Sequence, residues 1–132
     1  MIRIPKPIYE GVVEHAKRES PLECCGILAG KDGNVIRAFE ITNTEKSSVR
    51  FLMSPLEQVK VFEELEKESI EMIAIYHSHP HSVSFPSETD VKMAFYPEII
   101  SIIISLEDRD NPVVKAFQVD KETILAEEIE II

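Results

Sequence analysis

Apolar residues recur at helical spacing in the first twenty positions of the chain. Ile8, Val12 and Ala16 would share one face of a helix, and Pro7 suits its first turn. The charged residues that follow end this pattern near Ser20. We therefore expect an N-terminal helix with its apolar face against a core.

A second helix is predicted from residue 55. Ser54 is a suitable cap, Pro55 fits the first helical position, and Glu57 stands three residues after the serine. The helix is expected to bury one apolar face and to expose a charged one. The apolar positions that predict the buried face are Leu56, Val59, Phe62 and Leu65.

Most of the remaining apolar segments are typical of strands. The hairpin signal Asp32-Gly33 separates two of them. The predicted strands cover residues 24–29, 35–41, 50–53, 72–79, 99–104, 113–119 and 123–132, with a short helix over 88–96. Helices and strands alternate early and strands dominate late. This order predicts an α/β fold with a mixed sheet flanked by helices, in one domain over residues 1–132.

Charge and composition exclude several classes of partner. The chain has 14 basic and 24 acidic residues, a net charge of −10, which argues against binding to nucleic acid or to an anionic membrane. No apolar run approaches the roughly 20 residues needed to cross a bilayer, and the N-terminus lacks the apolar core of a signal peptide. The two cysteines are adjacent, which disfavours a disulfide between them. We expect a cytoplasmic protein.

The sequence His77-Ser78-His79-Pro80 follows an apolar strand pattern and contains the first candidate site residues. Side chains alternate across a strand, so both histidines would lie on one face and Ser78 on the other. Their Cβ atoms would be about 6.5 Å apart, which allows both imidazoles to bind one ion. Pro80 would end the strand there.

A carboxylate follows at the predicted start of the short helix. Ser87 to Asp90 is typical of a helix cap, and capping alone could explain it. The same position would bring Asp90 near the histidine strand. Two imidazoles, one carboxylate and a position left for water form a catalytic zinc arrangement.

These residues resemble a known family. His-Ser-His-Pro followed by Ser-x-x-Asp, with seven residues between His79 and Ser87, is similar to the signature of the JAMM, or MPN-plus, metalloproteases. The segment from Pro21 to Gly30 resembles the part of that family that carries an upstream glutamate. The resemblance extends over most of the chain, and it implies the curved MPN sheet with a cytidine-deaminase-like α/β/α architecture.

The resemblance also implies the roles of individual residues. His77, His79 and Asp90 would bind one Zn²⁺ per chain, Glu23 would be the general base, and Ser87 would stabilise the oxyanion. The residues alone leave the base undecided among many acids. Glu23 has one distinction, because it opens an apolar strand where partial burial would raise its pKa. Without the resemblance, an exposed residue at a strand start is the simpler interpretation.

The function implied is a zinc-dependent peptidase or isopeptidase that cleaves after the C-terminal tail of a ubiquitin-like (β-grasp) or sulfur-carrier protein. Two alternatives remain. One is release of a single C-terminal amino acid, such as cysteine, from a sulfur carrier. The other is a non-catalytic MPN scaffold, which the intact ligand set disfavours.

Three further residues have simpler interpretations. His81 follows Pro80 and is expected in an exposed loop. Phe85 could line a substrate groove or could equally be a packing residue. His15, near the end of the first helix, is expected to complement the helix C-terminus.

Overall fold

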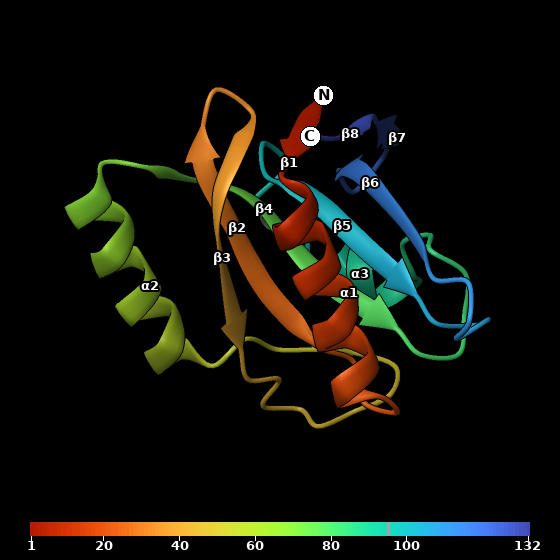
Figure 1. The fold of residues 1–132 in the computed structure, drawn as a ribbon. Coiled ribbons are helices and arrows are strands. Elements are labelled where there is room, and N and C mark those ends of the chain that lie inside the picture. The colour runs from red at the N-terminus through yellow and green to blue at the C-terminus, as the bar shows by residue number, and fades with distance from the viewer. Residues whose placement is uncertain (95) are drawn as a thin grey trace.

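The computed structural model describes residues 1–94 and 96–132 of the chain. Three helices accompany one eight-stranded mixed sheet in this part of the chain (Figure 1). The elements in chain order are β1 (Ile2–Ile4), α1 (Lys6–Glu19), β2 (Cys25–Lys31), β3 (Asn34–Ile41), α2 (Pro55–Glu68), β4 (Glu71–His79), α3 (Glu88–Lys92), β5 (Ile100–Ser105), β6 (Val113–Val119), β7 (Ile124–Glu127) and β8 (Ile129–Ile131).

The strand order across the sheet is β7-β6-β5-β4-β2-β3-β1-β8. β4 pairs in parallel with β5 and antiparallel with β2, so the sheet is mixed as predicted. β7 and β8 lie at its two ends, although Glu128 alone separates them in the chain. One residue spans only about 3.5 Å. The sheet must therefore curve until its two edges approach each other, which agrees with the curved sheet that was expected.

The β2–β3 hairpin forms at the predicted turn. Asp32 and Gly33 have φ values of 51° and 77°. Positive φ at both central residues is typical of the type I′ turn, whose twist matches the flanking strands. The hairpin pairs antiparallel from Cys25 with Ile41 to Lys31 with Asn34.

The two long helices cover opposite faces of the sheet. Val12 and Ala16 of α1 pack with Leu28 in one buried cluster. Val61 and Leu65 of α2 pack in another cluster, whose β2 members are Cys25, Ile27 and Ala29. Odd and even positions of β2 face opposite sides, so the molecule has the expected α/β/α layers.

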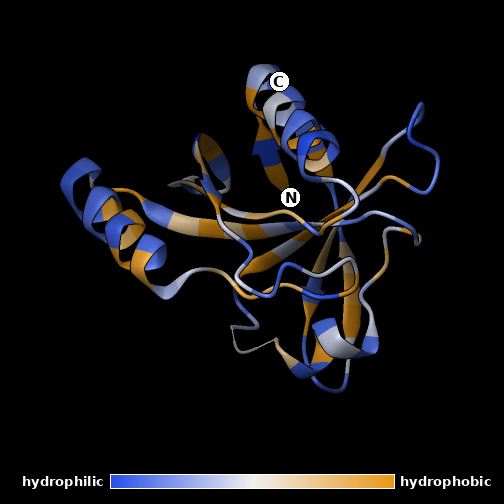
Figure 2. Ribbon diagram, turned by 90° about the horizontal axis from the view of Figure 1, so that it is seen from below, coloured by the Kyte–Doolittle hydropathy of each residue, from blue (hydrophilic) through white to orange (hydrophobic). Residues whose placement is uncertain are grey.

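α2 buries a different face from the one predicted. Leu65 is buried as expected, together with Val61, but Leu56, Val59 and Phe62 are 67%, 52% and 46% exposed. The helix carries apolar residues in two directions, and Figure 2 shows apolar and polar residues alternating along α2. Val61 and Leu65 pack against the sheet and are buried there. The apolar periodicity alone does not predict which of the two faces is buried.

Three other predicted boundaries were wrong. Residues 50–53 form no strand; the segment makes one isolated bridge, between Asn43 and Met53. The last predicted strand is divided into β7 and β8, which pair with different partners at opposite edges. The short helix ends at Lys92, so the predicted span to residue 96 was too long; its position 95 lies outside the described residues.

His15 does not complement the end of α1. It is buried, and its Nδ1 lies 2.7 Å from the Tyr76 hydroxyl on β4. Gly26 on β2 faces Tyr76, and any side chain at that glycine would collide with the tyrosine ring. None of the helices in the described ranges has the length and apolar character required to cross a membrane.

Candidate metal centre

β4 places two histidines at the middle of the sheet. His77 pairs with Cys25 of β2 and with Ile103 of β5, so strands fix its backbone on both sides. The side chains of His77 and His79 are each 4% exposed. Ser78 points to the other face, where its Oγ accepts a hydrogen bond of 2.8 Å from the Cys24 N–H. The alternation predicted for this strand is confirmed, and the strand ends before Pro80.

α3 brings a carboxylate to the same place. The Ser87 hydroxyl accepts from the Asp90 N–H at 3.1 Å, and Asp90 Oδ2 accepts from the Ser87 N–H at 2.9 Å. This reciprocal pair is a capping box, so the predicted helix start is confirmed. The box also fixes Asp90 in one orientation, with its carboxylate toward β4.

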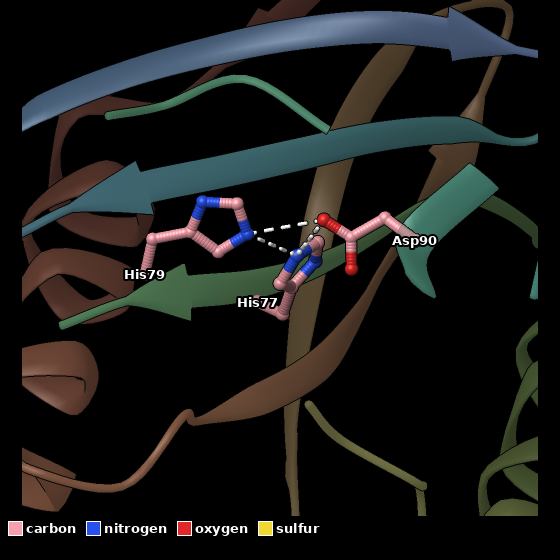
Figure 3. Close-up of side chains that lie close together, drawn as sticks. All are labelled: His77, His79 and Asp90. Atoms are coloured by element: carbon pink, nitrogen blue, oxygen red, sulfur yellow. Dashed lines mark hydrogen bonds and ion pairs between the residues drawn. The ribbon is translucent and has the colours of Figure 1, made fainter. Parts of the chain in front are cut away.

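The three side chains converge at one point (Figure 3). The Nε2 atoms of His77 and His79 are 3.1 Å apart, and Asp90 Oδ2 lies 3.2 Å and 3.0 Å from them. Ligands of a tetrahedral zinc ion with bonds of 2.0–2.1 Å are about 3.3 Å apart. The donors therefore match a zinc site in kind, and a small outward adjustment would match it in spacing.

A second contact sets the tautomer of one imidazole. His79 Nδ1 lies 2.8 Å from the carbonyl oxygen of Val83. A carbonyl oxygen only accepts, so Nδ1 carries a proton, and in the neutral ring Nε2 presents a lone pair to the site. The ring of His77 stacks on Phe51, with centroids 4.5 Å apart. Both rings are therefore held in position before any ion binds.

The charges of the site favour a cation. Burial by itself would raise the pKa of Asp90, but hydrogen bonds from His77 and His79 hold that pKa well below its usual range. For His79, burial would lower the pKa, while the hydrogen bond to Asp90 and the contact with Val83 raise it. Asp90 therefore stays ionised at neutral pH, and its negative charge favours a divalent cation beside the two imidazoles.

Glu23 lies next to this cluster, before the first residue of β2. Its side chain is buried, with 3% of the residue exposed, and Oε1 has no hydrogen-bond partner among the residues that the structure describes. Burial raises the pKa of Glu23 to about 7; His79 opposes this shift and Asp90 adds to it. The exposed strand-start alternative is wrong for this residue. A buried carboxyl with an unpartnered oxygen is suited to exchange a proton with a bound molecule.

Two residues around the site had no signal in the sequence. Asn43 donates from Nδ2 to the Glu23 carbonyl oxygen at 3.0 Å, and its Oδ1 accepts from the Leu52 N–H at 3.0 Å. It therefore ties the 43–53 segment to the start of β2. Phe51, which was predicted to be in a strand, instead stacks on His77.

An apolar pocket opens beside the cluster. It is lined by His77 and Asp90 on one side and by mainly apolar residues elsewhere, among them Phe51, Ile75, Pro86, Met93 and Tyr96. His77 and Asp90 of the cluster therefore face an apolar recess. Phe85 is not among the residues that line this pocket; it is half exposed and packs edge-on against Phe117. His81 is exposed in the loop, as predicted.

Comparison with known proteins gives consistent relatives. The family described as "Prokaryotic homologs of the JAB domain" matches residues 5–120. A CysO-cysteine peptidase of Mycobacterium tuberculosis is 30% identical over 127 residues, which cover 95% of this chain and 87% of that protein. A desampylase of Pyrococcus furiosus is 39% identical over 85 residues, 64% of this chain and 61% of that protein.

Among solved structures, protein DSY2949 of Desulfitobacterium hafniense superimposes with a TM-score of 0.92 at 34% identity. The match covers 100% of this chain and 93% of that one. The similarity therefore includes the whole sheet and its three helices.

Proposed function

This chain belongs to the prokaryotic JAB-domain family, and from that premise we propose that it is a zinc-dependent peptidase or isopeptidase. Its substrate is the bond after the C-terminal tail of a ubiquitin-like, β-grasp carrier protein. The observation that carries the proposal is the convergence of His77, His79 and Asp90 beside the buried carboxyl of Glu23. The cytoplasm is the proposed location, because both cysteines are free and buried.

We assign one zinc ion per chain to the three converging ligands. The two Nε2 lone pairs and the ionised Asp90 would hold it, with a fourth position open. Zinc bound in such a site supplies a Lewis acid and lowers the pKa of a coordinated water to about 7. The second contact of His79, to Val83, keeps its ring oriented for that role.

Glu23 is the proposed general base. Its carboxylate takes the proton of the attacking water and later delivers it to the leaving amine. A pKa of about 7 suits both transfers at neutral pH, because the group can then hold or release a proton at little cost. No hydrogen bond within the described chain occupies Oε1, so this oxygen is available to the water.

Ser87 is the proposed oxyanion donor. Its oxygen already accepts from the Asp90 N–H, which leaves the hydroxyl hydrogen for the substrate carbonyl oxygen. Capping and transition-state stabilisation are therefore compatible in one side chain. The capping box also places the hydroxyl within three residues of a metal ligand.

Ser87→Ala is expected to reduce turnover by roughly 10²–10³-fold with zinc content unchanged, because one donor to the oxyanion is lost. Steady-state kinetics on a cleavable fusion and elemental analysis measure both. Ser54→Ala is the matched control, since Ser54 also caps a helix, by accepting from the Glu57 N–H, and is not one of the proposed site residues. Near-normal turnover of Ser87→Ala would leave Ser87 with capping alone.

The substrate class rests on the relatives. The M. tuberculosis relative is named for CysO-cysteine, and it matches 95% of this chain. That name favours one specific alternative, the release of a single C-terminal cysteine from a carrier protein. A tail that ends in glycine suits either reaction, because glycine allows the backbone to approach a narrow site closely.

We expect zinc-dependent cleavage immediately after Gly-Gly in a fusion or a lysine conjugate of a small β-grasp protein, abolished by a chelator. Mass spectrometry of the products locates the cut. The comparison needs three substrates: that fusion, the same carrier with one C-terminal cysteine, and an unstructured peptide with the same tail. The folded fusion should be cleaved much faster than the peptide.

The other outcomes are informative. Preference for the cysteine adduct would assign the single-residue reaction. Equal cleavage of the bare peptide would make the protein a general peptidase. Absence of cleavage with zinc bound would favour the scaffold alternative.

A further inference from the structure

The side-chain amide of Asn43 makes four hydrogen bonds to the backbone. Its Nδ2 donates to the carbonyl oxygens of Glu23 at 3.0 Å and Arg50 at 3.1 Å. Its Oδ1 accepts from the N–H groups of Glu45 and Leu52, both at 3.0 Å. Carbonyl oxygens only accept and N–H groups only donate, so these partners fix which end of the amide is nitrogen. The buried side chain therefore uses its full capacity of two donors and two acceptors.

One of these bonds holds the backbone of the proposed general base. The Glu23 N–H donates to the carbonyl oxygen of Ser47 at 2.8 Å, and the Glu23 carbonyl oxygen accepts from Asn43. The segment 43–53 thus binds both backbone polar groups of Glu23, whereas the strand pairing of β2 begins two residues later, at Cys25. Glu23 therefore takes its position from this segment as well as from the strand that follows it.

Two further bonds of the same amide bracket Phe51. Asn43 binds the carbonyl oxygen of Arg50 on one side of Phe51 and the N–H of Leu52 on the other. The Phe51 ring stacks on the imidazole of His77, with an angle of 25° between the two planes. One amide therefore fixes both the backbone of the proposed base and the residue that packs on a proposed metal ligand.

The placement of the Glu23 carboxyl depends on this support. Within the described chain, its Oε1 has no hydrogen bond that would hold it in place. Packing and the anchored backbone must therefore determine where the carboxyl lies. A general base has to come within about 2.6–3.2 Å of the atom whose proton it takes. A displacement of about 1 Å can reduce a rate by about 10²-fold.

We propose that Asn43 is a positioning residue for hydrolysis, which holds Glu23 at a fixed place relative to His77 and the other metal ligands. This inference rests on the proposed function and adds a residue that acts through the base. The alternative is that Asn43 only stabilises the 43–53 segment. The two roles differ in what happens when Glu23 can no longer accept a proton.

The first test is Asn43→Asp in the zinc-loaded protein, with a cleavable β-grasp fusion as substrate. Aspartate has the size of asparagine, but its ionised carboxylate has no donor for the two carbonyl oxygens that Nδ2 binds. We expect kcat to fall roughly 10- to 100-fold, because the base is displaced. KM should stay within about twofold of the wild-type value. Zinc content should be unchanged, since Asn43 is not one of the three converging ligands.

Two further variants accompany this one. Asn43→Ser keeps a hydroxyl that donates one bond and accepts another, so its loss in kcat should be smaller than that of Asn43→Asp. It also supplies the comparison if the aspartate variant does not fold, which thermal unfolding reveals. Thr44→Val is the matched control, because it removes a side-chain bond of 3.1 Å to the Leu52 carbonyl oxygen in the same segment. It should turn over the fusion as the wild type does.

A double-mutant cycle with Glu23→Gln separates positioning from loss of folded protein. If Asn43 acts through Glu23, adding Asn43→Asp to Glu23→Gln should lower the single-turnover rate by less than about threefold. A smaller folded fraction would instead lower the rate by the same factor in both backgrounds. Asn43→Ser is carried through the same cycle.

Three results would overturn the positioning role. The first is wild-type kcat in both Asn43 variants. The second is an equal loss with and without the Glu23 carboxylate, which would leave Asn43 with structural stabilisation alone. The third is loss of zinc from the Asn43 variants, which would assign the residue to the metal ligands. If the zinc-loaded wild type does not cleave the fusion, the proposed function itself fails, and that result is distinct from all three.

Discussion

Glu23→Gln should keep its zinc and lose roughly 10²–10⁴-fold in kcat/KM, the usual contribution of a positioned general base. Glutamine has the shape of the carboxyl group but cannot accept the water's proton. Because Glu23 is not one of the three converging ligands, the metal should remain bound. Single-turnover kinetics and elemental analysis on the same preparation measure both quantities. Glu45→Gln, an exposed glutamate in the 43–53 segment, is the matched control.

The same variant should gain stability in the metal-free protein, in a manner that depends on pH. Burial raises the pKa of Glu23 to about 7 in the folded state, from an ordinary 4.5. The folded state therefore binds this proton more tightly than the unfolded state. The resulting stability is fully present below pH 4.5 and is lost as pH rises through 7.

Glutamine does not titrate, so the stability of Glu23→Gln relative to wild type should rise by about 2 kcal/mol between pH 5 and pH 8. Denaturant unfolding in chelator measures this difference. A variant that lost zinc would show that Glu23 is a ligand and not the base. A stability difference that is the same at both pH values would show that its carboxyl is not held out of water.

Removing a residue that hydrogen-bonds to a metal ligand typically weakens metal binding 10- to 100-fold. His77→Ala removes a proposed ligand itself, so it should weaken zinc binding by more than that. Hydrolysis should fall to the background rate. Removing this imidazole leaves two of the proposed ligands, and a catalytic zinc site typically has three protein ligands. Wild-type protein should retain about one zinc per chain after loading and dialysis, measured by elemental analysis. The alanine variant should retain much less under the same conditions.

His81→Ala is the control for His77→Ala, because it removes an exposed imidazole four residues along the same segment. It should bind zinc and turn over substrate as the wild type does. A wild type that stays metal-free after zinc loading would remove the basis of the hydrolase proposal. Equal zinc loss in His77→Ala and His81→Ala would mean that the ion binds elsewhere.

The predictions for Glu23→Gln and His77→Ala distinguish loss of the proton acceptor from loss of metal binding. Both depend on groups that are shielded from solvent: the three proposed ligands, whose side chains are almost fully buried, and the Glu23 carboxyl, whose pKa burial raises to about 7. Burying Glu23 costs stability, and it gives the proposed general base a pKa that suits proton transfer at neutral pH. This is a trade-off typical of active sites.

The sequence by itself determined the local parts of this protein. Alternation along one strand was enough to put His77 and His79 on the same face, because a strand has a period of two. A serine followed three residues later by an acid was enough to begin α3 at the capping box of Ser87 and Asp90. The Asp32-Gly33 turn was likewise local, since its positive φ values follow from the residue types.

Only the tertiary structure decided what depends on neighbours far along the chain. Helical periodicity allowed α2 two apolar faces, and packing on β2 buried Val61 and left Val59 exposed. The raised pKa of Glu23 comes from burial in the folded protein, where Asn43, twenty residues along the chain, also binds the Glu23 backbone carbonyl. The final strand pattern became two strands because the curved sheet brings both of its edges to the C-terminus, where pairing partners, and not propensity, set the break.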